Sequence, residues 1–131
     1  MALLQARIDA TVVHAAQFND LAAPARALAA AWQRIALATE EAWASGDPAE
    51  ALANAVPYLQ AFGHAVLAWI WLDVAIAALR RELSAPEPMA LAGTIGCMTY
   101  FYQYELGKID AWLAPVRQRD MTCAQLPLEA F

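Results

Sequence analysis

The chain has 131 residues, the size of one domain, and carries a formal net charge of −5 with only 16% of its residues charged. Without a basic stripe, nucleic acid is excluded as an expected partner. Alanine is abundant, glycine numbers only 5, and β-branched residues are sparse, which predicts an all-α fold because alanine loses no side-chain entropy in a helix.

Apolar residues make up 61% of the chain, which is above the ordinary range. This composition predicts an unusually apolar helical bundle, an apolar surface left for a partner, or a membrane protein. No basic segment followed by an apolar core opens the chain, so no signal peptide is expected. The two cysteines, Cys97 and Cys123, belong to no CxxC pair, which favours a reduced cytoplasmic protein over a disulfide scaffold.

Residues 1–20 are expected to form a short helix or a connector. Apolar residues recur there at helical spacing: Leu4, Ile8, Val12 and Ala15. The β-branched run at 11–13 weakens the helical interpretation. Residues 21–131 are expected to form one helical bundle domain that ends in an irregular tail.

An amphipathic helix is predicted from about Leu21 to Ala44. Asp20 can act as its N-cap, Pro24 fits the first turn because its missing N–H is no loss there, and Gly46 is a natural stop. The predicted buried stripe consists of Leu28, Trp32, Ile35, Thr39 and Ala42.

The next helix is predicted to begin at Asp47, which can cap it, with Glu50 reaching back to the N–H of the cap residue. Pro57 lies well inside this helix and removes one backbone bond. We therefore expect a kink or a short break before Tyr58. The helix is expected to end near Leu83, ahead of two prolines.

The segment 54–81 is the stretch around which the chain is organised. Its middle, 65–72, is apolar on every side, which in a soluble helix requires neighbours on more than one face. We therefore interpret it as the central helix of a bundle. A membrane span is disfavoured, because the best window, 61–79, contains His64 and Asp73 and falls short of ~20 uninterrupted apolar residues.

A third long helix is predicted over 88–113. Its apolar stripe has spacings of three and four: Leu91, Ile95, Met98, Tyr102, Leu106, Ile109 and Leu113. Gly93 and Gly96 put a flat surface on its first half, where another backbone can come close. Beyond Pro115 the tail is expected to be irregular as far as Phe131.

Two polar residues of the central helix are candidates for chemistry. His64 would need partners as a general base or a metal ligand, and His14 is the only other histidine. We expect a packed histidine bonded to a backbone group or a tyrosine hydroxyl. Asp73 must be paired, solvated or neutral, and pairing across helices is the expected solution. Its candidate partners are Arg26, Arg34 and Lys108.

An aromatic cluster with one carboxylate lies in the third helix. Glu105 could be buried with a raised pKa, but a solvated position is favoured, as it is for the pair at 40–41. Tyr100, Tyr102 and Tyr104 could stack on a base or a flavin, yet aromatic side chains at helical spacing are more often part of a core.

The sequence contains no recognisable catalytic motif. Ser45 and Ser84 lie in predicted turns, and neither belongs to a GxSxG motif. Neither GxGxxG nor GxxxxGK[ST] is present. We therefore predict no catalytic, cofactor-binding or metal-binding residue.

Two segments, NAVPYLQAFGHAVLAWIWL and GCMTYFYQYELGKIDAWLAPV, carry a recognisable pattern. It resembles the helical domain at the C-terminal end of a branch of FAD-dependent acyl-CoA dehydrogenases. There, A-x-PYL-x-x-FG-x-x-x-x-x-W precedes an aromatic FY segment and an EL-P turn. The matching residues are Ala55, Pro57, Tyr58, Leu59, Phe62, Gly63, Trp69, Phe101, Tyr102, Glu105 and Leu106. Gly107 stands in place of the proline, so the third helix is expected to run on without a break.

The resemblance covers 21–131 and implies a role in flavin-dependent oxidation of an acyl-CoA thioester in fatty acid metabolism. It implies that FAD and the catalytic glutamate belong to preceding dehydrogenase domains, outside this chain. The expected role here is non-catalytic: covering the catalytic body, shaping the mouth where CoA enters, or helping subunits associate. The alternative is a free-standing helical interaction module, and the third hypothesis is a membrane-embedded bundle.

The apolar composition also predicts self-association. Five tryptophans cannot all point at one bundle axis, so some are expected to lie in a surface patch: Trp32, Trp43, Trp69, Trp71 and Trp112. In the parent enzyme that patch is expected to face the dehydrogenase body or another subunit. Alone, the chain is expected to form a two-fold dimer, the commonest closed symmetry.

Overall fold

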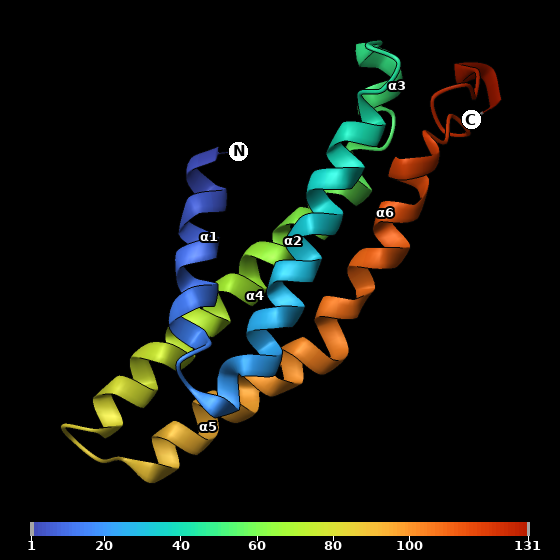
Figure 1. The fold of residues 1–131 in the computed structure, drawn as a ribbon. Coiled ribbons are helices and arrows are strands. Elements are labelled where there is room, and N and C mark those ends of the chain that lie inside the picture. Colours follow the sequence, from blue (N-terminus) through green and yellow to red (C-terminus); the bar gives the residue numbers. More distant parts are fainter. Residues whose placement is uncertain (1, 131) are drawn as a thin grey trace.

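The computed structural model describes residues 2–130, and this part of the chain is helical and contains no strand (Figure 1). The α-helices are α1 (Ala2–Ala15), α2 (Ala22–Ala42), α3 (Pro48–Leu52), α4 (Ala55–Glu82), α5 (Pro88–Tyr100) and α6 (Ile109–Gln118). Single 3-10 turns occupy Asn19–Leu21, Leu106–Lys108 and Leu128–Ala130, and a π-helical segment occupies Phe101–Glu105. The predicted all-α class is confirmed. Met1 and Phe131 lie outside the described residues.

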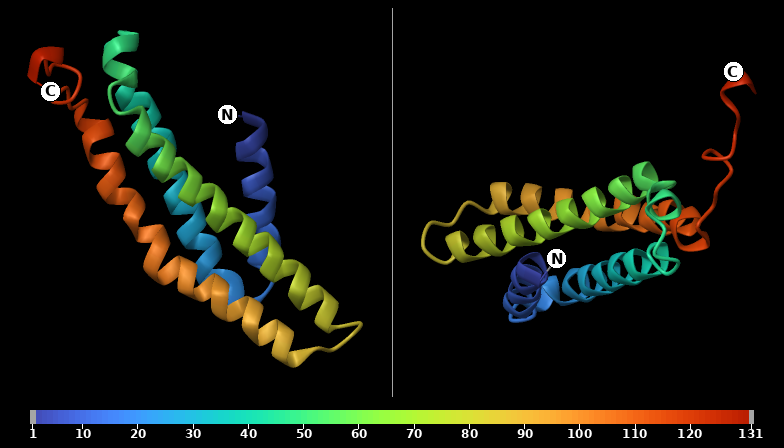
Figure 2. Two further views of the ribbon diagram at one scale, coloured as in Figure 1. Left: turned by 180° about the vertical axis from the view of Figure 1, so that it is seen from behind. Right: turned by 90° about the horizontal axis from the view of Figure 1, so that it is seen from above.

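The helices pack in two layers, with consecutive long helices running in alternating directions (Figure 2). One layer holds α1 and α2, and the other holds α4 beside the run from α5 to α6. Because α4 contacts α1, α2, α5 and α6, it is the central helix that the sequence predicts.

Helix α2 confirms the predicted amphipathic helix, with a different start. Pro24 lies in its first turn, and Gly46 follows its end with a φ of 73°, a left-handed conformation that glycine adopts without strain. The prediction that Asp20 caps this helix is wrong. Residues 19–21 form a 3-10 turn that places Leu21 at the cap position, where no side chain caps the helix.

The break before α4 is confirmed. The Asp47 carboxylate accepts a hydrogen bond from the N–H of Ala49 at 2.9 Å and so caps the short helix α3. The chain turns at 53–54, and Pro57 therefore lies in the first turn of α4, where its missing N–H costs nothing. Glu50 does not reach back to the cap as predicted. The N–H of Asp47 donates to Oγ of Ser45 instead, and the Glu50 carboxylate lies 3.4 Å from Arg119, at the same end of the bundle (Figure 1).

The core is built on an inner face of α4 that consists mostly of small residues. Its buried members are Ala61, Ala65, Ala68, Leu72, Ala75 and Ile76. Alanine at these positions lets the large buried side chains of α2 come close, and Trp32, only 2% exposed, packs its ring 5.4 Å from that of Phe62. The interior is thus filled by pairing small residues on α4 with large ones on α2.

The outer face of α4 is apolar as well, but it is uncovered. Leu67, Ile70 and Val74 are 45%, 46% and 43% exposed. No described element crosses α4 when the molecule is seen from behind (Figure 2, left). In length and composition α4 could cross a membrane, a test that core helices also pass, and 28% of its most apolar window is buried. The neighbours expected around 65–72 therefore cover one side of this helix.

The third predicted helix extends further than expected. Helical structure continues through Gly107, which stands where the resembling pattern has a helix-breaking proline. It also continues through Pro115 as far as Gln118. The predicted irregular tail thus starts too early. Leu113 and Val116 are buried, so packing holds the last turn despite the backbone bond that proline removes. Arg119 ends the helix with a left-handed φ of 52°.

One polar contact joins the N-terminal helix to the central helix. Residues 2–15 are helical through their β-branched run, which the sequence left open. Thr11 in that run is 7% exposed, and its Oγ1 accepts a hydrogen bond from Nε1 of Trp69 at 2.8 Å. The indole body packs against the core while its N–H meets a partner.

We predict that Trp69→Phe lowers the free energy of unfolding by about 1–3 kcal/mol, because it leaves the buried Thr11 hydroxyl without its donor. Urea unfolding of the wild type, Trp69→Phe, Thr11→Val and the double variant measures the coupling. The double variant should lose less stability than the two single losses added together. Strict additivity would show that the bond contributes nothing.

Candidate functional site

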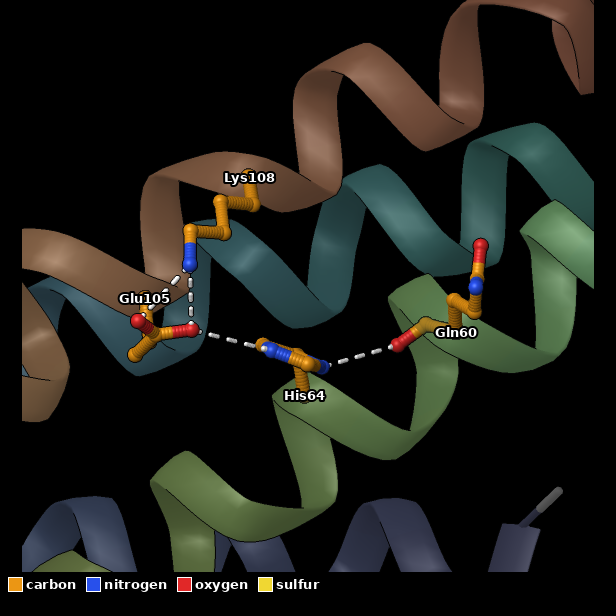
Figure 3. Close-up of polar contacts among 4 residues, drawn as sticks. All are labelled: Gln60, His64, Glu105 and Lys108. Carbon is orange, nitrogen blue, oxygen red and sulfur yellow. Dashed lines mark hydrogen bonds and ion pairs between the residues drawn. The ribbon is translucent and has the colours of Figure 1, made fainter.

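The polar cluster of greatest chemical interest joins α4 to the segment between α5 and α6 (Figure 3). Nε2 of His64 lies 3.4 Å from Oε2 of Glu105, and Nδ1 lies 3.2 Å from the backbone carbonyl of Gln60. Nζ of Lys108 donates to both oxygens of Glu105 at 2.7 Å. We call these residues, Gln60, His64, Glu105 and Lys108, the His64 cluster.

Aromatic rings hold the His64 ring in place. Its centroid lies 4.6 Å from that of Trp112 in an edge-on arrangement and 5.8 Å from that of Phe101. The expected packed histidine bonded to a backbone group is confirmed. The ion pair to Glu105 was missed, because nothing in the linear spacing of the two residues predicts that the helices bring them together.

The π-helical segment explains why Glu105 reaches α4. The N–H of Leu106 donates to the carbonyl of Phe101, five residues earlier, so one extra residue fits into the turn. Because of this spacing of five residues, Phe101 and Leu106 both point into the core and are buried. The turn shifts the register of the buried stripe between α5 and α6, and Glu105 falls on the side that faces His64.

The electrostatics of the His64 cluster keep its carboxylate ionised. The hydrogen bond from Lys108 lowers the pKa of Glu105 against the opposing effect of desolvation, and His64 lowers it further. The raised pKa considered from the sequence is therefore wrong. A general base works best with a pKa near the operating pH, so a carboxylate held ionised by a lysine is poorly suited to that role. The role of the His64 cluster is therefore to hold α4 against the segment between α5 and α6.

The three tyrosines divide between core and surface. The hydroxyl of Tyr102 donates to the carbonyl of Ala68 at 2.9 Å, and burial raises the pKa of Tyr102 well above its ordinary value. Tyr100 and Tyr104 are 58% and 62% exposed, and their ring centroids lie 4.9 Å apart. The prediction that these aromatic side chains belong to the core is therefore confirmed for Tyr102. Tyr100 and Tyr104 form an exposed aromatic pair instead.

Asp73 is exposed, and its predicted pairing across helices is wrong. The predicted partners lie elsewhere. Nε of Arg34 is 3.1 Å from Asp110, Lys108 belongs to the His64 cluster, and Arg26 is exposed on α2. Asp73 lies on a flank of α4 that water reaches, so a charged carboxylate needs no partner there.

A second set of ion pairs lines a groove of about 510 Å3 between α2 and α6. Nε of Arg117 donates to Glu41 at 2.6 Å, and this bond lowers the pKa of Glu41 and raises that of Arg117. Arg34 and Asp110 face each other in the same groove, and Glu40, the residue before Glu41, is exposed. Since both guanidinium groups already face carboxylates, the groove is not a ready site for an anion.

The remaining candidates are dispersed. Cys97 and Cys123 are free and exposed, and His14 is exposed on α1. Ser45 and Ser84 each bond a backbone group of their own turn. Among residues 2–130, no three His, Cys, Asp or Glu side chains gather where they could hold a metal ion.

Comparison with known proteins identifies one relationship. A family model described as "Acetyl-CoA dehydrogenase C-terminal like" matches residues 4–127 of the chain. No curated protein and no solved structure matches it.

We predict that Glu105→Gln destabilises the protein more at pH 7 than at pH 3. The depressed pKa of Glu105 contributes stability that is present above its ordinary pKa of 4.5 and is lost as the pH falls through the folded value. Urea unfolding at the two pH values measures the difference.

Glu40→Gln is the matched control, because the Glu40 side chain is exposed and lies outside the His64 cluster. It should change the free energy of unfolding little at either pH. An equal loss of stability at pH 3 and pH 7 in Glu105→Gln would contradict an electrostatic role for the His64 cluster.

Proposed function

The chain belongs to the family of acetyl-CoA dehydrogenase C-terminal-like domains, and from this premise we propose that it serves a flavin-dependent acyl-CoA dehydrogenase as its non-catalytic helical module. The family match spans nearly the whole chain. The proposed roles are covering the dehydrogenase body, shaping the mouth through which the acyl-CoA enters, and helping subunits associate in the cytoplasm.

The observation that carries this proposal is the uncovered apolar face of α4. A helix that is apolar on the side opposite the core exposes surface that a partner would remove from water. The His64 cluster supports the same interpretation, because its charged groups tie α4 to the segment between α5 and α6.

The FAD implied by the family finds no free cation for its phosphates in the groove between α2 and α6 or in the His64 cluster. A dinucleotide needs backbone N–H groups or free cations for its phosphates. Arg34 and Arg117 face carboxylates, and Lys108 donates to both oxygens of Glu105. We therefore propose that the flavin is held by dehydrogenase domains that accompany this module.

The same apolar face also favours a second candidate, a free-standing helical interaction module that binds the dehydrogenase or another protein. The two candidates differ in whether the module and the dehydrogenase domains form one polypeptide. They predict different masses for the protein in the cell.

We predict that an antibody raised against this chain detects, on a denaturing gel of the source organism's lysate, a polypeptide several times heavier than 14.2 kDa. Peptide mapping of that band should return dehydrogenase sequence. The purified chain alone should be colourless and should not oxidise an acyl-CoA. A 14 kDa band would favour the free-standing module, and a yellow chain with stoichiometric flavin would contradict both candidates.

A further inference from the structure

The ring of His64 lies between two oxygen acceptors (Figure 3). Its Nδ1 is 3.2 Å from the backbone carbonyl oxygen of Gln60, and its Nε2 is 3.4 Å from Oε2 of Glu105. A neutral imidazole has one N–H, so in either tautomer one nitrogen presents a lone pair to an oxygen. The imidazolium form has two N–H groups and donates to both oxygens. The geometry therefore suits the charged form of the ring.

Water is only partly available to relieve a lone pair that faces an oxygen. The side chains of His64 and Glu105 are 25% and 24% exposed. The rings of Phe101 and Trp112 lie against the imidazole on the protein side. Because an unsatisfied polar contact in such a place costs free energy, the neutral ring gives up one of its two contacts. The bond to Gln60 stays within one turn of α4, so the contact that loosens is the one that crosses to Glu105.

The charged groups that face His64 are one carboxylate and one ammonium. They belong to Glu105 and to Lys108, whose Nζ donates to both oxygens of that carboxylate. The helix α5 contains no charged residue, and α4 contains no acidic residue, lysine or arginine between positions 55 and 72. The paired charges of α2 face α6 instead: Arg34 and Glu41 meet Asp110 and Arg117. The ionisable residues of α1 are exposed: Arg7, Asp9 and His14.

We propose that His64 is a pH-dependent link between α4 and the π-helical segment, closed when its ring is protonated and loosened when the ring loses that proton. The inference concerns the helical module itself and does not rest on a dehydrogenase partner. Histidine is the side chain that ordinarily ionises between about pH 5 and pH 8, so the link responds within this range. The segment it holds, Phe101–Glu105, sets the register between α5 and α6. Loosening the link therefore frees these two helices to move relative to α4.

The direction of the pH dependence follows from which state binds the proton. The folded protein holds the proton between two acceptors, whereas the unfolded chain offers the ring only water. A folded state that binds more protons than the unfolded state loses stability as the pH rises. Glu105 stays ionised throughout this range, because the hydrogen bond from Lys108 lowers the pKa of Glu105. The contribution of the link is therefore present near about pH 6 and lost toward about pH 8.

Urea unfolding of the full chain at pH 6 and pH 8 tests the link. Between these pH values the folding equilibrium constant of the wild type should fall about threefold more than that of His64→Gln, the size expected for a partly exposed ion pair. Glutamine does not ionise, so it donates to Glu105 equally well at both pH values. His14→Gln, at an exposed position on α1, is the matched control and should follow the wild type.

Nitrogen-15 NMR of the wild type tests the link without a substitution at His64. At pH 6 both ring nitrogens of His64 should carry a proton. Between pH 6 and pH 8 the backbone amide signal of Leu106, whose N–H closes the π-helical turn, should move together with the titration of that ring. The same movement should remain in His14→Gln, because His14 lies on α1 in the other layer (Figure 2).

Three results would overturn the proposal. One is an equal fall of the folding equilibrium constant in the wild type and in His64→Gln between pH 6 and pH 8. Another is a His64 ring that holds a single proton at pH 6. The third is a Leu106 amide signal that stays fixed while the ring titrates. If His64→Gln does not fold, the ring and amide signals of the wild type decide alone.

Discussion

The structure depends on the close approach of helices to one side of α4. Alanines on that side leave room for Trp32 and its neighbours on α2, and the same side also contacts α1, α5 and α6. Close packing of large side chains against small ones supplies most of the contact that holds a single-domain bundle of this size together. The opposite side of α4 is apolar as well, but no element within residues 2–130 covers it.

Polar contacts in this protein fix the angles between helices. The His64 cluster joins α4 to the π-helical turn, the bond from Trp69 to Thr11 fixes α1, and Arg117 with Glu41 ties α6 to α2. Each contact connects elements that are distant in sequence.

Several features of the fold follow from local sequence alone. Pro24, Gly46 and Asp47 mark helix ends through their own backbone geometry or hydrogen-bonding capacity, and each acts where the pattern predicts. In the predicted stripe of the third helix, Met98, Leu106, Ile109 and Leu113 are buried, and the other members are partly buried. Helix ends of this kind can be predicted without the tertiary structure, because the groups that determine them are only a few residues apart in the chain.

The sequence by itself therefore determined the helical class, most helix boundaries and the apolar excess of 54–81. Only the tertiary structure decided which partner each polar group takes. Glu105 meets His64, Glu50 lies by Arg119 instead of capping, and Asp73 faces water. The physical reason is that the rotation of each helix about its axis, which the π-helical turn resets, determines which charged side chains come within a few ångströms of one another.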